Sequence, residues 1–244
     1  MSAPDRSHRN RPTAARLLAA ATLAVAATAA VAPAAAQVPP SAAEVQAYRG
    51  LHAAAQRGDV ATIRRLGAAD KAALEARDAH GRTPLHVATF ARQAEAVRAL
   101  IQAGADTAAF ESGRYDAVTI AAVADDEKTL AVLLELGASA RLVTSRYDGT
   151  ALIAAAHLGH DGVVRRLIAA GAPLDHVNNL HWTALIEAVV LGDGGPRHQA
   201  TVRALLDAGA NTQLADRSGR TPLQLARSHG YARIVQMLEA AGAR

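Results

Sequence analysis

Side chains that bind metal ions or transfer protons are concentrated between positions 148 and 198. They are Asp148, His157, His160, His176, His181, Glu187, Asp193 and His198. Imidazole and carboxylate groups can hold zinc or copper, and a pair of carboxyl groups can hydrolyse a saccharide. The spacing favours neither role, because there is no His-Glu-x-x-His constellation. In addition, His157 and His160 share a helix face only if the helix runs through Gly159.

The signatures of common enzymes are also missing. The chain has no cysteine to act as a nucleophile, and it has no Gly-x-Ser-x-Gly elbow or phosphate-binding loop. We therefore predict a protein without catalytic residues, metal or cofactor, in which the histidines and carboxylates form a hydrogen-bonded network. The alternative is a ligand-binding or hydrolytic protein that acts on cell-wall material through a polar site around these residues.

Aromatic residues number seven, and four of them stand in or beside predicted turns. Tyr and Trp supply large, rigid contact areas and dominate interface hot spots. Two of the tyrosines lie in Arg-Tyr-Asp triplets that are two residues out of register with each other. The alternative role for these rings is to pack between adjacent turns and close the core. The predicted partner-binding residues are Phe110, Arg114, Tyr115, Arg146, Tyr147, His181 and Trp182.

The elements that position these residues come from a repeat of about 33 residues, which is clearest from position 78 to 105. Asp78 and Gly81 predict a turn, Thr83 a helix cap and Pro84 the first helical position. Two stretches with apolar residues at helical spacing follow, and Gly104 ends the second. One such helix pair cannot bury its own apolar face, so neighbouring pairs must stack into a solenoid.

The residues Thr83-Pro84-Leu85-His86 and Thr221-Pro222-Leu223-Gln224 carry a resemblance to the ankyrin repeat. The resemblance covers roughly positions 47 to 244 and implies an all-α solenoid of about six helix-turn-helix repeats joined by short β-hairpin fingers. It also implies a groove that binds other macromolecules, and structural roles for the signature histidine and for His160. Exported bacterial proteins of this kind resemble accessories or inhibitors of other exported proteins.

The boundaries follow from this pattern. Residues 37–46 form an N-terminal extension that contains the start of a capping helix, with Ser41 as its cap. In the third repeat Asp116 replaces the capping threonine, and in the fifth repeat five extra residues around 192–196 lengthen the turn between its helices. The predicted repeats are 47–77, 78–110, 111–143, 144–177, 178–215 and 216–244.

The first 36 residues differ in composition from the rest. Four arginines precede an uncharged Ala/Leu/Val run that ends near Pro33, and small residues follow at 34–36. This is typical of a signal peptide cleaved before Gln37, and the alternative is an uncleaved anchor. We expect export to the periplasm by the general secretory route and no membrane attachment after cleavage.

The net charge narrows the class of partner. The whole chain has 26 basic and 22 acidic residues, but residues 1–36 contribute four of the bases and one of the acids. The nearly neutral remainder has no block of Lys and Arg that could neutralise several phosphates, so we expect no nucleic acid. The expected partner is another exported protein. Self-association is also open, because the last predicted helix is not obviously polar.

Overall fold

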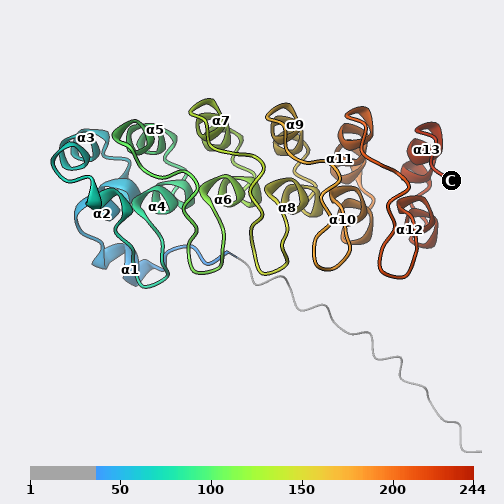
Figure 1. Ribbon diagram of the computed structural model, residues 1–244, viewed down its shortest axis with the longest axis horizontal. Coiled ribbons are helices and arrows are strands. Elements are labelled where there is room, and N and C mark those ends of the chain that lie inside the picture. Colours follow the sequence, from blue (N-terminus) through green and yellow to red (C-terminus); the bar gives the residue numbers. More distant parts are fainter. Residues whose placement is uncertain (1–36) are drawn as a thin grey trace, which may run out of the picture. The chain divides into compact units, whose positions relative to one another are not determined.

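Residues 37–244 are described in the computed structural model; the predicted signal peptide, 1–36, lies outside the described residues. The described part is a solenoid of helix pairs (Figure 1). One layer contains the first helix of each pair and a second layer contains the other helix, with hairpin loops projecting beneath the first layer (Figure 1). This confirms the predicted all-α solenoid of six repeats.

The first-layer helices are α2 (Gly50–Arg57), α4 (Pro84–Phe90), α6 (Ala117–Val123), α8 (Ala151–His157), α10 (Ala184–Val190) and α12 (Pro222–Ser228). The second-layer helices are α3 (Val60–Ala69), α5 (Ala94–Ala103), α7 (Glu127–Glu135), α9 (Asp161–Ala169), α11 (Pro196–Asp207) and α13 (Ala232–Ala240). Two short helices complete the described residues: α1 (Ala42–Ala47) and the 3₁₀ helix η1 (Ala72–Glu75).

The helices begin where local sequence directs them. Thr83 is the N-cap of α4, and the Nδ1 atom of His86 accepts a hydrogen bond from the Thr83 amide at 3.1 Å. Asp116 caps α6 through a bond from the Thr119 amide at 3.0 Å. Ser41 forms a capping box with Glu44 in α1. The predicted caps are therefore confirmed, because each depends on neighbours in sequence.

The core lies between the two layers and runs through all the repeats. Each first-layer helix packs against its counterparts in adjacent repeats and against the second helix of its own pair. Leu85, Leu152 and Leu185 are at most 1% exposed, and many of the remaining core residues are alanines that allow close helix approach. Each repeat therefore depends on its neighbours for burial of its apolar face.

Five hairpin fingers join the repeats, and each is closed by a bond from its first amide to its last carbonyl. We number them finger 1 (78–82), finger 2 (111–115), finger 3 (144–149), finger 4 (178–182) and finger 5 (216–220). Finger 3 is one residue longer and forms an isolated antiparallel bridge between Thr144 and Gly149. Within residues 37–244 the fingers are turns with single closing bonds and contain no extended strand.

The five extra residues of the fifth repeat divide between a turn and a helix. The turn between α10 and α11 has five residues, 191–195, where the α8–α9 turn has three, 158–160. Helix α11 has 12 residues and α9 has nine. The prediction that the insertion lengthens the turn is thus correct for two residues only. The other three extend α11, because Pro196 occupies the first helical position.

The N-terminal extension packs on finger 1. Arg82 is completely buried and donates to the Val38 carbonyl at 3.0 Å, to the Glu44 carboxylate and to Asp78 Oδ2 at 2.6 Å. The Tyr48 hydroxyl also donates to Asp78, at 2.7 Å. Burial raises the pKa of Asp78, but the bonds from Tyr48 and Arg82 outweigh burial and hold it at about 2.

Candidate functional site

The fingers bring side chains from successive repeats into rows. Residues at the same position of each finger lie one repeat apart along the solenoid, so a row runs along its long axis. The position before the last residue of a finger is occupied by Gly81, Arg114, Asp148, His181 and Gly219. Arg114 therefore aligns with Asp148 rather than with Arg146, which confirms that the two Arg-Tyr-Asp triplets are out of register.

This row has an unusual backbone conformation. All five residues have positive φ: 70° at Gly81, 64° at Arg114, 51° at Asp148, 64° at His181 and 75° at Gly219. A residue with a Cβ atom pays roughly 1–2 kcal/mol to adopt the left-handed region. The two terminal fingers avoid this cost by using glycine. The three central fingers accept it and place polar side chains at their tips.

The polar tips are exposed and partly paired. The Arg114 guanidinium lies 3.4 Å from Asp148, and the two side chains are 54% and 49% exposed. His181 is exposed. Arg146, also exposed, stacks its guanidinium 5.1 Å from the centre of the Tyr147 ring. Three of the predicted partner-binding residues, Arg114, Arg146 and His181, are therefore open to solvent on the central fingers.

The four predicted aromatic residues, in contrast, are all partly buried. Trp182 packs against the hydrophobic core cluster, which agrees with the packing role considered for these rings. Tyr115 approaches Gly113 so closely that a Cβ atom there would lie 3.2 Å from the tyrosine ring. Phe110 and Tyr147 are also intermediate in exposure. None of the four residues is fully buried, so each keeps some surface open to solvent.

Two residues beside this surface were missed from the sequence. Val143 is 38% exposed and Val177 is 42% exposed. Phe110, Val143 and Val177 directly precede fingers 2, 3 and 4, respectively. They occupy the same position in three adjacent repeats and so form an apolar row. The sequence contained a signal for these two residues: an apolar residue directly before a predicted turn is not needed for the core, so it can mark a contact surface.

A polar cluster lies where finger 4 meets the first helices. Asn178 donates from Nδ2 to Glu187 Oε1 at 3.0 Å, and His157 Nδ1 lies 3.3 Å from Glu187 Oε2. Glu187 is 5% exposed although it carries a carboxylate. The structure therefore joins His157 and Glu187, two members of the predicted hydrogen-bonded network, and brings Asn178 to the same carboxylate. The contacts of Glu187 are an amide and an imidazole, whereas glycoside hydrolysis uses two carboxyl groups.

Comparison with known proteins agrees with this architecture. A family model described as ankyrin repeats (3 copies) matches residues 40–111 and 118–216, and one described as ankyrin repeats (many copies) matches 196–239. The chain belongs to the ankyrin-repeat family. Among curated proteins, the putative ankyrin repeat protein YahD of Escherichia coli K12 is 37% identical over 191 residues, which cover 78% of this chain and 94% of YahD.

Solved structures show the same fold. An ankyrin repeat domain from Acinetobacter baumannii AYE is 46% identical and superimposes with a TM-score of 0.74, covering 80% of this chain and 98% of that one. A structure of the predatory endopeptidase Bd0816 from Bdellovibrio bacteriovorus in complex with the immunity protein Bd3460 contains a chain with 23% identity and a TM-score of 0.65. That match covers 79% of this chain and 98% of the other, and it supports the fold alone.

Four histidines of this ankyrin-repeat protein contact main-chain carbonyls that are distant in sequence. His86 Nε2 lies 3.0 Å from the Ala109 carbonyl, and His160 Nδ1 lies 2.9 Å from that of Ala122. His176 and His198 make equivalent contacts with the carbonyls of Asp148 and His157. His160 and His198 thus bond to the preceding repeat, whereas His86 and His176 bond to a carbonyl of their own predicted repeat. Within residues 37–244 no group of three or more His, Asp or Glu could hold a metal ion.

Two buried titratable groups in the signature positions have shifted pKa values. Burial lowers the pKa of His86 to about 4, against the bond to the Ala109 carbonyl that favours the charged ring. Burial also raises the pKa of Asp116 despite the capping bonds from Thr119. The Oδ2 atom of Asp116 is buried without a hydrogen-bond partner. At neutral pH His86 is therefore uncharged, whereas Asp116 stores unfavourable desolvation energy.

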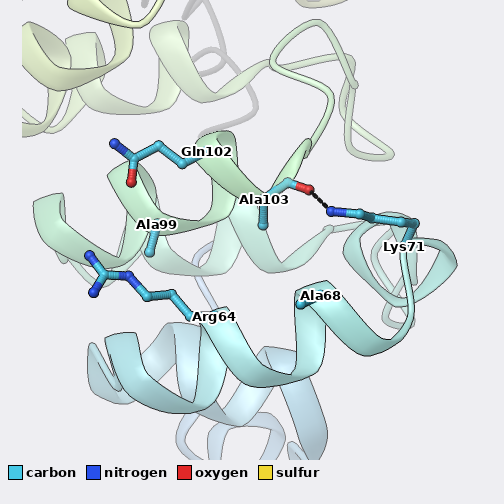
Figure 2. A pocket seen from close by; sticks show the side chains of 6 residues that line it. All are labelled: Arg64, Ala68, Lys71, Ala99, Gln102 and Ala103. Atoms are coloured by element: carbon cyan, nitrogen blue, oxygen red, sulfur yellow. Dashed lines mark hydrogen bonds between the residues drawn. The ribbon is translucent and has the colours of Figure 1, made fainter.

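A shallow hollow lies away from the fingers, between α3 and α5 of the second layer (Figure 2). It has a volume of about 300 Å³, and the Lys71 ammonium closes one side by donating to the Ala103 carbonyl at 2.6 Å (Figure 2). The other lining residues are Arg64, Ala68, Ala99 and Gln102. The lining contains no histidine or carboxylate for acid–base chemistry. No helix of residues 37–244 is both long and apolar enough to cross a membrane.

Proposed function

We propose that this protein is a periplasmic scaffold that binds another exported protein through fingers 2 to 4, as an accessory or regulator of that protein. The observation that carries the proposal is the left-handed backbone at Arg114, Asp148 and His181. Strain of this kind persists where the structure over-determines it and is concentrated at functional positions. Glycine would relieve it, as it does in fingers 1 and 5.

The surroundings of these tips have the composition of an interface. The exposed Arg146 and the partly exposed Phe110 and Tyr147 supply residue types that dominate binding energy. Val143 and Val177 add an apolar row beside them. A centre that combines aromatic, apolar and arginine side chains with a polar rim fits a protein surface better than a small ligand.

The export part of the proposal rests on residues 1–36. Their arginines, their uncharged run and the small residues at 34–36 support cleavage before Gln37. The structure of the Bdellovibrio endopeptidase with its immunity protein contains this fold in a protein complex, which agrees with a role beside another protein. The partner itself is not identified by that likeness.

Affinity capture tests the binding surface. Tagged residues 37–244 are incubated with periplasmic extract of the source bacterium, beside a variant with Arg114, Arg146 and His181 changed to alanine. These three side chains are exposed, so the variant is expected to keep its helical signal and melting temperature. We expect one or more proteins to be retained by the parent and lost from the variant.

A matched control changes three exposed arginines of the second layer, Arg65, Arg165 and Arg203, to alanine. This control should retain the partner. Equal retention by all three proteins would contradict the proposed surface. Export is tested separately by sequencing the N-terminus of the mature protein, which we expect to begin at Gln37. An intact Met1 on protein recovered from the cytoplasm would refute export.

A further inference from the structure

Fingers 1 and 5 contain the same charged pair at the same positions. Asp78 and Arg82 open and close finger 1, and Asp216 and Arg220 open and close finger 5. The Asp78 amide donates to the Arg82 carbonyl at 3.1 Å, and the Asp216 amide to that of Arg220 at 2.9 Å. Arginine at this position is absent from fingers 2 to 4, which end in Tyr115, Gly149 and Trp182.

The inner geometry of the two fingers also agrees. Asp78 Oδ1 accepts from the amides of His80 at 2.8 Å and Arg82 at 2.9 Å. Asp216 Oδ1 accepts from the amides of Ser218 at 2.8 Å and Arg220 at 2.9 Å. The backbone and the aspartate are thus built alike, so any difference between the fingers arises from what covers the arginine.

The arginine of finger 1 holds a peptide segment. Its guanidinium is shared between Asp78, the main-chain carbonyl of Val38 and the carboxylate of Glu44. Its side chain is 0% exposed. Residues 38–44 therefore act as a bound ligand: an extended stretch contributes a carbonyl, and a glutamate in the following helical turn contributes a carboxylate.

No segment within residues 37–244 covers the arginine of finger 5 in this way. Arg220 donates from Nε and Nη2 to Asp216 Oδ2 at 3.0 and 2.8 Å, and its side chain is 54% exposed. The exposed Arg217 lies in the same finger, so the finger carries net positive charge. The Tyr48 hydroxyl donates to Asp78 of finger 1, and Trp182, the last residue of finger 4, occupies the equivalent position of its own repeat.

We infer that finger 5 binds an acidic segment of the partner protein in the way that finger 1 binds residues 38–44. Arg220 would give one of its bonds with Asp216 to the incoming carboxylate and would donate to a main-chain carbonyl. Donation from one planar guanidinium to several separate acceptors suits arginine and not lysine. The inference rests on the proposed binding of a protein and adds the chemistry of one contact.

A peptide with the sequence of residues 37–48 is the probe. In the 37–244 protein, finger 1 already holds its own tethered copy at high effective concentration, so added peptide is directed to finger 5. Trp182 is the single tryptophan of the chain. It lies in finger 4, next to finger 5, so we use its fluorescence to follow binding of the peptide at finger 5. We expect the fluorescence to change with peptide concentration until it saturates. The dissociation constant should be about tenfold higher for a peptide with Glu44→Gln.

Two variants separate charge from geometry. Arg220→Ala should abolish saturation and Arg220→Lys should weaken it, whereas Arg233→Ala on α13 should leave it unchanged. No saturation with the parent, or equal saturation with Arg220→Ala, would overturn the inference. A dimer of the parent that Arg220→Ala dissociates in sedimentation would make a second copy the occupant and overturn the assignment to a partner. If the captured protein is lost from the Arg114, Arg146 and His181 variant but kept by Arg220→Ala, the proposed function stands and this inference fails.

Discussion

Replacing His181 with glycine is expected to raise the free energy of unfolding by about 0.5–1 kcal/mol. His181 has a φ of 64°, and a side chain in that region costs roughly 1–2 kcal/mol. Glycine removes this cost but loses about 0.5–1 kcal/mol more conformational entropy on folding. The side chain is exposed, so little packing is lost. In a protein of this size the gain corresponds to roughly 1–4 °C in melting temperature.

The reciprocal change provides the control. Gly219 occupies the same row in finger 5 with a φ of 75°, and a Cβ atom added there would meet nothing within 4 Å. Gly219→His should therefore lower the unfolding free energy by a similar amount, through backbone strain alone. Urea unfolding followed by circular dichroism measures both variants. A destabilised His181→Gly, or an unaffected Gly219→His, would refute the account of strain in the fingers. Partner capture should weaken for His181→Gly even as its stability increases.

Two further predictions concern pH. Asp116→Thr restores the capping residue found in four other repeats and should raise the unfolding free energy at pH 7 by about 1 kcal/mol, since it removes an unsatisfied buried carboxylate oxygen. Because the folded pKa of Asp116 is raised, protonation of Asp116 stabilises the folded parent protein. The stability gained by Asp116→Thr should therefore shrink toward pH 4. An equal gain at pH 7 and pH 4 would contradict the view that the buried carboxylate of Asp116 is destabilising. For His86, a folded pKa of about 4 against 6.5 when unfolded gives stability that is complete above 6.5 and falls by about 3 kcal/mol as the pH approaches 4. His86→Gln, which introduces the residue that Gln224 supplies in the last repeat, should lose much less over that range in urea titrations, and parallel losses would disprove the role of His86.

The elements that the sequence predicted well depend on short-range chemistry. Asp116 and Ser41 cap helices because each side chain reaches an amide three residues away. Thr83 caps α4 through its bonds with the His86 ring. Gly104 ends α5 in the left-handed conformation that glycine favours. The period of the pattern then requires the repeats to stack, because a single helix pair leaves its apolar face exposed.

The candidate site was only partly predictable. Arg114 and His181 were selected beside aromatic residues, but their left-handed backbone could not be read from residue type, since fingers 1 and 5 use glycine there. The sequence left Trp182 open between binding and packing, and the structure adds that it packs against the core while staying partly exposed. Whether the predicted residues bind a partner is still to be tested by capture.

The sequence by itself determined the repeat, the helix starts and the family, because these follow from turn residues, caps and apolar periodicity within about 33 residues. Tertiary structure alone decided which distant groups meet. Val38 and Arg82 are 44 positions apart and are joined by packing of the N-terminal extension on finger 1. Glu187 and His157 are 30 positions apart and are joined by packing between repeats. The burial of Arg82 and the exposure of Arg220 depend on whether another segment covers the finger. Fingers 1 and 5 have the same Asp and Arg at the same positions, so their own sequences do not show which of the two arginines is buried by another segment.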